Sequence, residues 1–125
     1  MSQRKVSWAC ARVVKACSKL SSTQKLIWLE HYGLANGKDG AAWISASGLG
    51  RRLNLARVTV ERERQNLLRF DLIAKKDRGA GRTDDWFPQL PSCCRPTRLR
   101  LTDDEVEEYA EQLDRLIATR SATSL

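Results

Sequence analysis

The chain has 125 residues, of which 42% are apolar, and a formal net charge of +7. This length fits one domain, and the apolar fraction is too high for a wholly disordered chain. The sequence contains no run of about 18 apolar residues, so we expect no membrane-spanning helix. Charges interrupt the first twenty residues, which therefore lack the apolar centre of a secretion signal, and we expect a cytoplasmic protein.

The charge is unevenly distributed along the chain. Residues 1–102 carry 20 Lys or Arg and 8 Asp or Glu, a net charge of +12. Residues 103–125 carry 2 Lys or Arg and 7 Asp or Glu, a net charge of −5. A basic body of this kind favours a polyanionic partner. The alternative is that the charges only keep a small protein in solution.

Two short helices are predicted at the start of the chain. The first is amphipathic, because apolar residues recur at helical spacing at Val6, Cys10, Val13, Val14 and Cys17. The second runs from Gln24 to Tyr32, after the capping hydroxyls of residues 21–23. His31 is expected on the surface of this helix rather than as a ligand or a base. The residues expected to face inward are Leu26, Ile27 and Leu29.

A helix, a tight turn and a longer helix are predicted after the glycine-rich turn of residues 33–40. Either Ser45 or Ser47 caps the first of these helices. Asn54 tolerates the left-handed conformation, so the chain is expected to reverse there. The longer helix is expected to run from Arg57 to Phe70. The residues expected to be buried are Leu49, Leu53, Leu55, Val60, Leu67 and Leu68.

A hairpin and a final helix complete the predicted elements. Residues 72–74 and 86–87 are expected to form two strands around a turn that contains Gly79 and Gly81. The final helix, from Asp103 to about Ile117, begins with acidic residues that suit the positive end of its dipole. Its apolar stripe consists of Val106, Tyr109, Ala110, Leu113, Leu116 and Ile117.

The middle of the chain carries a recognisable pattern. Residues 49–60 read LGRRLNLARVTV, with Trp43-Ile44-Ser45 before them and Leu67 and Leu72-Ile73 after them. This arrangement resembles the winged helix-turn-helix families, in which a Leu-Ala-x-x-Leu-Gly-hydrophobic-Ser-x-x-Thr-Val run leads into a Leu…Gly-Leu-Ile ending. With residues 23–26 and 31–32, the similarity extends over residues 20–90 to the DNA-binding domains of phage and plasmid replication proteins and related bacterial transcription regulators.

The resemblance implies a mainly α fold with a small β-hairpin, in which residues 20–91 form a winged helix-turn-helix domain. Residues 1–19 would form an N-terminal amphipathic helix, residues 92–102 a connector, and residues 103–125 an acidic C-terminal helix and tail. The implied function is sequence-specific recognition of double-stranded DNA, as a transcription regulator or a replication-associated factor.

Three groups of residues are expected to contact DNA. An α-helix fits the major groove, where arginine can make a forked contact with guanine, so the longer helix would read bases through Arg57, Thr59 and Arg62. The supporting helix would contact phosphates through Arg51 and Arg52. By resemblance, the hairpin would lie along the phosphates or enter the minor groove with Lys75, Lys76, Arg78 and Arg82. This interpretation requires Arg57 and Arg62 to be exposed and not paired with carboxylates of their own chain.

Several residues depart from the family pattern. Ala56 replaces the usual Ser or Thr cap, and Asp71 stands where Gly usually ends the helix. Glu63 and Arg64 occupy positions that are normally small and apolar. Arg64 would point toward the core, with its stem packed and its head reaching water or a carboxylate.

Two alternatives concern the partners. The apolar stripe of the final helix either packs on the rest of the chain or pairs with a second copy, which would make a homodimer. A winged scaffold can also serve as a protein-interaction module, in which the basic face meets an acidic partner.

No cofactor or metal is expected. The spacing of Cys10, Cys17, Cys93 and Cys94 fits poorly with the short cysteine pairs of zinc sites. Cys10 and Cys17 lie seven residues apart and are expected to pack as small hydrophobic residues. The sequence has no serine–histidine–acid arrangement, no phosphate-binding glycine loop and no paired catalytic carboxylates, so we predict no enzyme.

Overall fold

The computed structural model describes residues 5–81 and 83–122. It is mainly helical with one small antiparallel hairpin, which confirms the predicted fold class at this level. The elements in chain order are α1 (Trp8–Ala16), α2 (Ser22–Leu34), α3 (Ala46–Leu53), α4 (Arg57–Arg69), β1 (Ile73–Lys76), β2 (Asp85–Pro88), the 3-10 helix η1 (Ser92–Cys94) and α5 (Asp103–Ala122). Within the described ranges, no helix combines the length and the apolar character needed to cross a membrane.

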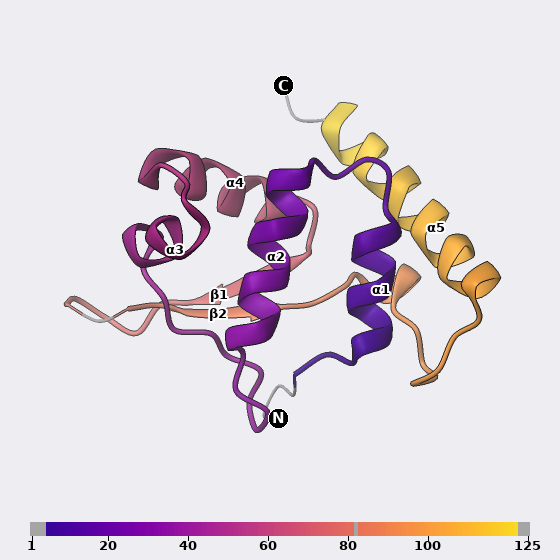
Figure 1. Ribbon diagram of the computed structural model, residues 1–125, viewed down its shortest axis with the longest axis horizontal. Coiled ribbons are helices and arrows are strands. Elements are labelled where there is room, and N and C mark those ends of the chain that lie inside the picture. The colour runs from indigo at the N-terminus through magenta and orange to yellow at the C-terminus, as the bar shows by residue number, and fades with distance from the viewer. Residues whose placement is uncertain (1–4, 82, 123–125) are drawn as a thin grey trace.

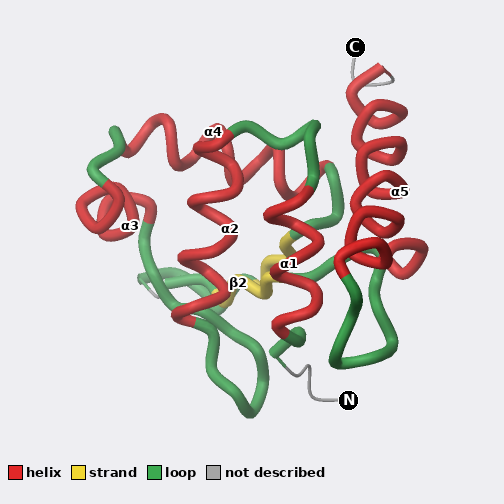
Figure 2. The backbone as a smooth tube through the Cα atoms, turned by 45° about the vertical axis from the view of Figure 1, so that its right-hand side comes forward, coloured by secondary structure: helices red, strands yellow, loops and turns green. Residues whose placement is uncertain are grey.

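The elements divide the molecule into two ends with α2 between them (Figure 1). Helices α1 and α5 lie side by side at one end, which we call the α5 end. Helices α3 and α4 and the strands β1 and β2 form the other, the hairpin end, from which the turn of the hairpin projects (Figures 1 and 2). One apolar core runs through both ends and includes Trp28, Leu49, Leu67, Leu72 and Leu113.

Helix α2 is longer than predicted and is turned differently about its axis. Ser21 caps it, since the Gln24 N–H donates to Ser21 Oγ and the Ser21 N–H donates to the Gln24 side chain. Leu26 was expected to face inward, which is wrong, because it is 43% exposed. Trp28 is fully buried instead, and its indole N–H donates to the carbonyl of Leu72 at 2.8 Å. This one large residue fixes which face of α2 meets the core.

The hairpin is confirmed, but β1 begins at Ile73 rather than at Leu72 and continues to Lys76. Strand β2 extends one residue beyond each predicted end. Lys75 pairs with Trp86, and Lys76 pairs with Asp85, in an antiparallel register. Ala42 forms a single bridge to Trp86, through N–H···O hydrogen bonds of 2.7 and 3.0 Å. The segment before α3 is therefore tied to the hairpin, and this contact holds the α3 side of the hairpin end in place.

Helix α5 packs against α1 of its own chain. Of the predicted stripe, Val106, Ala110, Leu113 and Ile117 are buried. Tyr109 and Leu116 are only partly buried. Thr102 caps the helix, and the Glu105 N–H donates to its Oγ1. Helix α1 covers the buried part of this stripe, so the stripe does not need a second copy of the chain to bury it. Homodimerisation through α5 stays a prediction.

Two of the four cysteines, Cys10 and Cys17, pack in the core as predicted. Cys10 and Cys17 are buried, together with Cys94, whereas Cys93 is exposed. All four thiols are free. In the part of the chain that the structure describes, no three His, Cys, Asp or Glu side chains gather where they could hold a metal ion.

Candidate nucleic-acid interface

Helices α3 and α4 are joined by the tight turn that the sequence predicts. Ser45, one of the two candidate caps, accepts a hydrogen bond from the Gly48 N–H at the start of α3. Asn54 ends α3 in the left-handed conformation, with a φ of 57°. The Leu55 N–H then donates to the carbonyl of Gly50 at 2.8 Å. A Cβ at position 50 would lie 2.5 Å from the Leu55 carbonyl oxygen, so only glycine allows this turn.

Helix α4 has one buried and one exposed face. Val60, Arg64 and Leu67 are buried, and Ala56 provides no side-chain cap, as predicted. On the other face, Val58 is 67% exposed. The side chains of Arg57 and Arg62 are 71% and 64% exposed, so both project into solvent. Thr59, the third residue expected to read bases, is only half-exposed.

The hairpin carries the second group of predicted contacts. Lys75, Lys76 and Arg78 are exposed, whereas Arg82 lies outside the described residues. Gly79 has a φ of 100° and Gly81 a φ of 79°, a region that favours glycine, so both glycines are needed for the turn. Arg51 and Arg52 on α3 are exposed as well, so each of the three elements expected to contact DNA presents cations to solvent. We call the surface of Arg51, Arg52, Arg57, Arg62, Lys75, Lys76 and Arg78 the basic ridge.

Most cations of the basic ridge have a carboxylate of their own chain nearby. Arg57 Nε lies 2.6 Å from Glu61, and Arg62 Nε lies 3.6 Å from Glu63. The requirement that both arginines be unpaired is therefore not met. The other pairs are Arg52–Glu30 at 2.7 Å, Lys75–Asp84 at 3.5 Å and Arg78–Asp85 at 3.8 Å.

These ion pairs do not close the surface to an anion. Every cation in them keeps at least 40% of its side chain exposed. In the Arg57–Glu61 pair the carboxylate is 48% exposed as well, and exposed pairs of this kind typically contribute only about 0–1 kcal/mol. A phosphate group can therefore replace the carboxylate at little cost. Among the described residues, Arg51 and Lys76 have no carboxylate within 4.0 Å.

His31 lies behind the basic ridge and is fully buried, so its predicted surface position is wrong. Its Nδ1–H donates to the carbonyl of Ile27 at 2.8 Å, as a neutral ring with its proton on Nδ1 allows. Its Nε2 accepts hydrogen bonds from Arg64 Nε at 3.2 Å and from Arg64 Nη2 at 3.1 Å. Burial, together with the positive charge of Arg64, lowers the pKa of His31 to about 4.

Arg64 points inward as predicted, but its partners differ from those expected. Its head contacts His31 and donates from Nη2 to the carbonyl of Ile44 at 2.7 Å, rather than to water or a carboxylate. Its guanidinium carbon lies 4.3 Å from the centre of the Trp86 ring. Burial lowers the pKa of Arg64 to about 10, and Asp84 opposes this shift, so the side chain remains charged at neutral pH.

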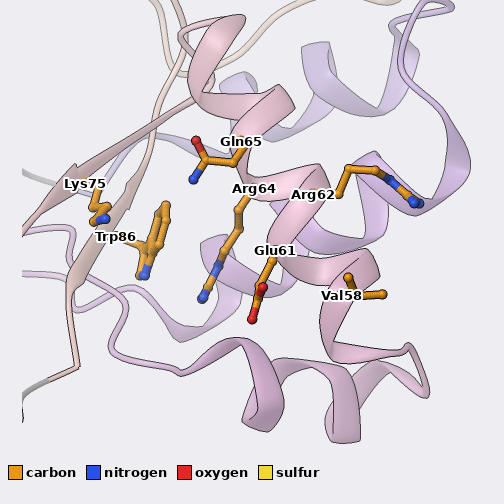
Figure 3. A pocket seen from close by; sticks show the side chains of 7 residues that line it. All are labelled: Val58, Glu61, Arg62, Arg64, Gln65, Lys75 and Trp86. Atoms are coloured by element: carbon orange, nitrogen blue, oxygen red, sulfur yellow. The ribbon is translucent and has the colours of Figure 1, made fainter.

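A groove of about 510 Å³ separates α4 from the hairpin. In Figure 3, Trp86 stands between Lys75 and Arg64, and the Arg64 head points down between α4 and the indole. Arg62 extends away from Trp86 in the same view. The remaining lining residues are Val58, Glu61 and Gln65. The groove was not predicted from the sequence. Its one signal was Arg64, a charged residue at a position that is small and apolar in the family pattern.

Comparisons with protein-family models, with curated proteins and with solved structures give no match for this chain.

Proposed function

We propose that this protein binds double-stranded DNA through α4 and the hairpin, as a winged helix-turn-helix protein. One observation carries the proposal: the first turns of α4 project Arg57 and Arg62 into solvent, and the elements that flank α4 in the chain, α3 and the hairpin, carry further exposed cations. A helix with such a face fits the major groove, while flanking cations can contact the phosphates on either side. Regulation of transcription and replication of a phage or plasmid are both compatible with this role.

The element order also supports the proposal. A capped helix, a bridge to the hairpin, a helix, a left-handed turn, a second helix and the hairpin follow one another along residues 21–88. The buried face of α4 fixes its direction relative to α3, since Val60 and Leu67 are fully buried. An arginine held in this way can select guanine, and each good base contact contributes about 1–3 kcal/mol of discrimination.

Titration of the pure protein with random duplex DNA at low and moderate salt tests the proposal. We expect binding at low salt that weakens steeply as salt rises, because each phosphate contact releases counterions. Duplexes selected from a random pool then report sequence preference. Arg57→Ala and Arg62→Ala should relax this preference, whereas Arg78→Ala should weaken all duplexes alike.

Arg100→Ala is the matched control, since it removes one exposed cation from the segment before α5. It should change duplex affinity only slightly. Absence of binding at low salt would refute DNA recognition. Unchanged affinity and preference in all three ridge variants would show that the reading surface lies elsewhere.

A second candidate function is binding of an acidic protein partner. Two exposed apolar residues favour it, since Val58 on α4 is 67% exposed and Trp43 before α3 is 52% exposed. The Arg78 guanidinium lies 5.8 Å from the Trp43 ring, so charge and apolar area occur together, as in many protein interfaces. Failure to bind any duplex at low salt, with retention of an acidic peptide or protein by the natural chain but not by Val58→Asp, would favour this function.

A further inference from the structure

We propose that the groove between α4 and the hairpin binds a phosphate of the DNA backbone, with Arg64 as the receptor on its floor. This inference rests on the proposed function and goes further, because it assigns a phosphate site to a buried residue that the basic ridge does not include. It also gives the His31–Arg64 pair a purpose, namely to hold the guanidinium in one orientation.

The Arg64 head is held in place on one side and open on the other. Its Nε and Nη2 donate to His31 and to the Ile44 carbonyl, and the guanidinium stacks on Trp86. In the part of the chain that the structure describes, the remaining nitrogen, Nη1, has no acceptor, yet it is not sealed from solvent. A guanidinium fixed in this way binds an oxyanion without losing side-chain freedom, which strengthens the contact.

The charge of Arg64 has no carboxylate in direct contact among the described residues, and Asp84 acts on it only from beyond 4.0 Å. The residue is only 4% exposed, and none of the described carboxylates lies within 4.0 Å of it. Glu61 lines the same groove, but it pairs with Arg57 at 2.6 Å. Burying a cation without a counterion is costly, so an anion that enters the groove stabilises the folded protein as well as the complex.

The groove has the dimensions and the further cation that a nucleic-acid backbone requires. About 510 Å³ exceeds the volume of a single phosphate and leaves room for the adjoining sugar. Lys75 lies across the indole from Arg64 in Figure 3, with its Nζ 5.7 Å from the centre of the Trp86 ring. A duplex whose major groove contains α4 presents its backbone beside that helix, where the hairpin stands.

Nuclear magnetic resonance of the natural protein tests the site without a substitution. The Arg64 Nε–H is protected by its hydrogen bond to His31, so its signal should be observable. Arg95 offers a matched control signal, since its Nε–H donates to the Leu90 carbonyl at 3.0 Å near η1. We expect a short random duplex to shift the Arg64 signal in step with binding and to leave the Arg95 signal unmoved. Inorganic phosphate alone, as the second probe, should shift the Arg64 signal weakly.

Salt dependence gives a second readout. For Arg64→Gln we expect duplex affinity to fall roughly tenfold and the slope of log affinity against log salt to decrease by about 1, as for one lost phosphate contact. Arg100→Gln should leave the slope unchanged. If Arg64→Gln does not fold, the Arg64 and Arg95 signals of the natural protein still test the phosphate site.

The outcomes separate this inference from the proposed function. A bound duplex that leaves both the Arg64 signal and the salt slope of Arg64→Gln unchanged would overturn the phosphate site while DNA binding stands. A signal that responds to inorganic phosphate but not to bound duplex would assign the groove to a free small anion, which also overturns it. Absence of duplex binding at low salt would refute the proposed function, and the inference with it.

Discussion

The two ends of the molecule use their charged side chains in opposite ways. At the α5 end, Asp114 accepts hydrogen bonds from Cys17 Sγ at 2.8 Å, from the Ser18 N–H and hydroxyl at 2.9 and 2.7 Å, and from the Lys19 N–H at 3.0 Å. At the hairpin end, Glu61, Glu63, Asp84 and Asp85 pair with cations that remain exposed, although Glu63 also accepts hydrogen bonds from Gln24 and Asn66. The buried Arg64 has no carboxylate within 4.0 Å among the described residues. The carboxylate of Asp114 thus stabilises the fold at the α5 end, whereas the cations at the hairpin end remain accessible to an anion.

The pKa values reflect this difference. Burial alone would raise the pKa of Asp114, but the hydrogen bonds from Cys17, Ser18 and Lys19 outweigh it and lower the pKa. Burial and the bond to Asp114 raise the pKa of Cys17 to about 12. For Arg64 the balance is reversed, because burial lowers its pKa to about 10 and the opposing effect of Asp84 does not outweigh it. The buried groups at the α5 end therefore stabilise the fold, whereas the burial of Arg64 at the hairpin end carries a cost that the proposed phosphate would reduce.

The largest expected effect comes from the α5 end. Leu113 is fully buried between α5 and α1, so Leu113→Ala should lower the free energy of unfolding by about 2–5 kcal/mol. Denaturant unfolding measures this loss, and Leu99→Ala, at a residue that is 79% exposed, should change it by less than about 0.5 kcal/mol. Duplex affinity of the folded variant should be unchanged. Weaker binding by the folded variant would show that the two ends are coupled.

Acid should destabilise the hairpin end through His31. The unfolded chain binds a proton at this residue below a pKa of about 6.5, whereas the folded protein holds the pKa at about 4. Stability is therefore complete above pH 6.5 and falls as the pH is lowered from 6.5 to 4, by about 3 kcal/mol in all. Unfolding by denaturant at pH 7 and at pH 4 measures the loss.

His31→Gln is the control for this prediction, because glutamine can accept a hydrogen bond from Arg64 but does not titrate. Between pH 6.5 and 4 the free energy of unfolding of His31→Gln should fall much less than that of the natural protein. At neutral pH the variant should be less stable than the natural protein. The pKa of Asp114 is also lowered, so protonation of this carboxylate reduces stability only at still lower pH, below about 3.8. An equal loss in the natural protein and in His31→Gln would assign the acid sensitivity to another group.

Removal of the Asp114 carboxylate tests whether hydrogen bonds hold the α5 end. Asp114→Ala should lower the free energy of unfolding by about 2 kcal/mol, since it leaves the donors of residues 17–19 with water alone. Glu107→Ala, on the same helix and exposed, is the matched control and should have little effect. If both variants lose the same stability, the contrast between the two ends is weaker than the geometry indicates.

The elements could be predicted from the sequence because local patterns determine them. The stripe of α5 follows a helical period, Asn54 marks the left-handed turn, and Gly79 and Gly81 mark the turn of the hairpin. Asp71, where the resemblance expects glycine, has a φ of 61° and so adopts the conformation of the residue that it replaces. These are properties of short segments, which is why they are readable in one chain.

The buried polar pair could not be predicted in the same way. His31 and Arg64 lie 33 positions apart. The sequence marked Arg64 as unusual and inward-pointing, but nothing in either helix identified His31 as its partner. The ion pairs of the basic ridge include one that could have been predicted from the sequence and one that could not. Arg57 and Glu61 are four residues apart on one helix and could have been paired from spacing alone. Arg52 meets Glu30 of α2 only through the packing of helices.

The smallest expected effect concerns Glu61, a carboxylate that would compete with the phosphates of the proposed DNA ligand at the hairpin end. It pairs with Arg57 and lines the groove beside Arg64, so Glu61→Gln removes a competitor of phosphate at both places. We expect duplex affinity to rise about two- to fivefold at low salt, since an exposed pair contributes about 0.2–1 kcal/mol, and the gain should shrink as salt screens it.

Glu107→Gln removes the same charge from α5 and should raise duplex affinity much less, because only its long-range field acts on the hairpin end. Equal gains in duplex affinity in the two variants would mean that net charge alone governs binding. The two ends would then not differ in their affinity for an anion. A loss of affinity in Glu61→Gln would mean that this carboxylate orients Arg57 for its contact, so that the ion pair would belong to the binding surface instead of competing with it.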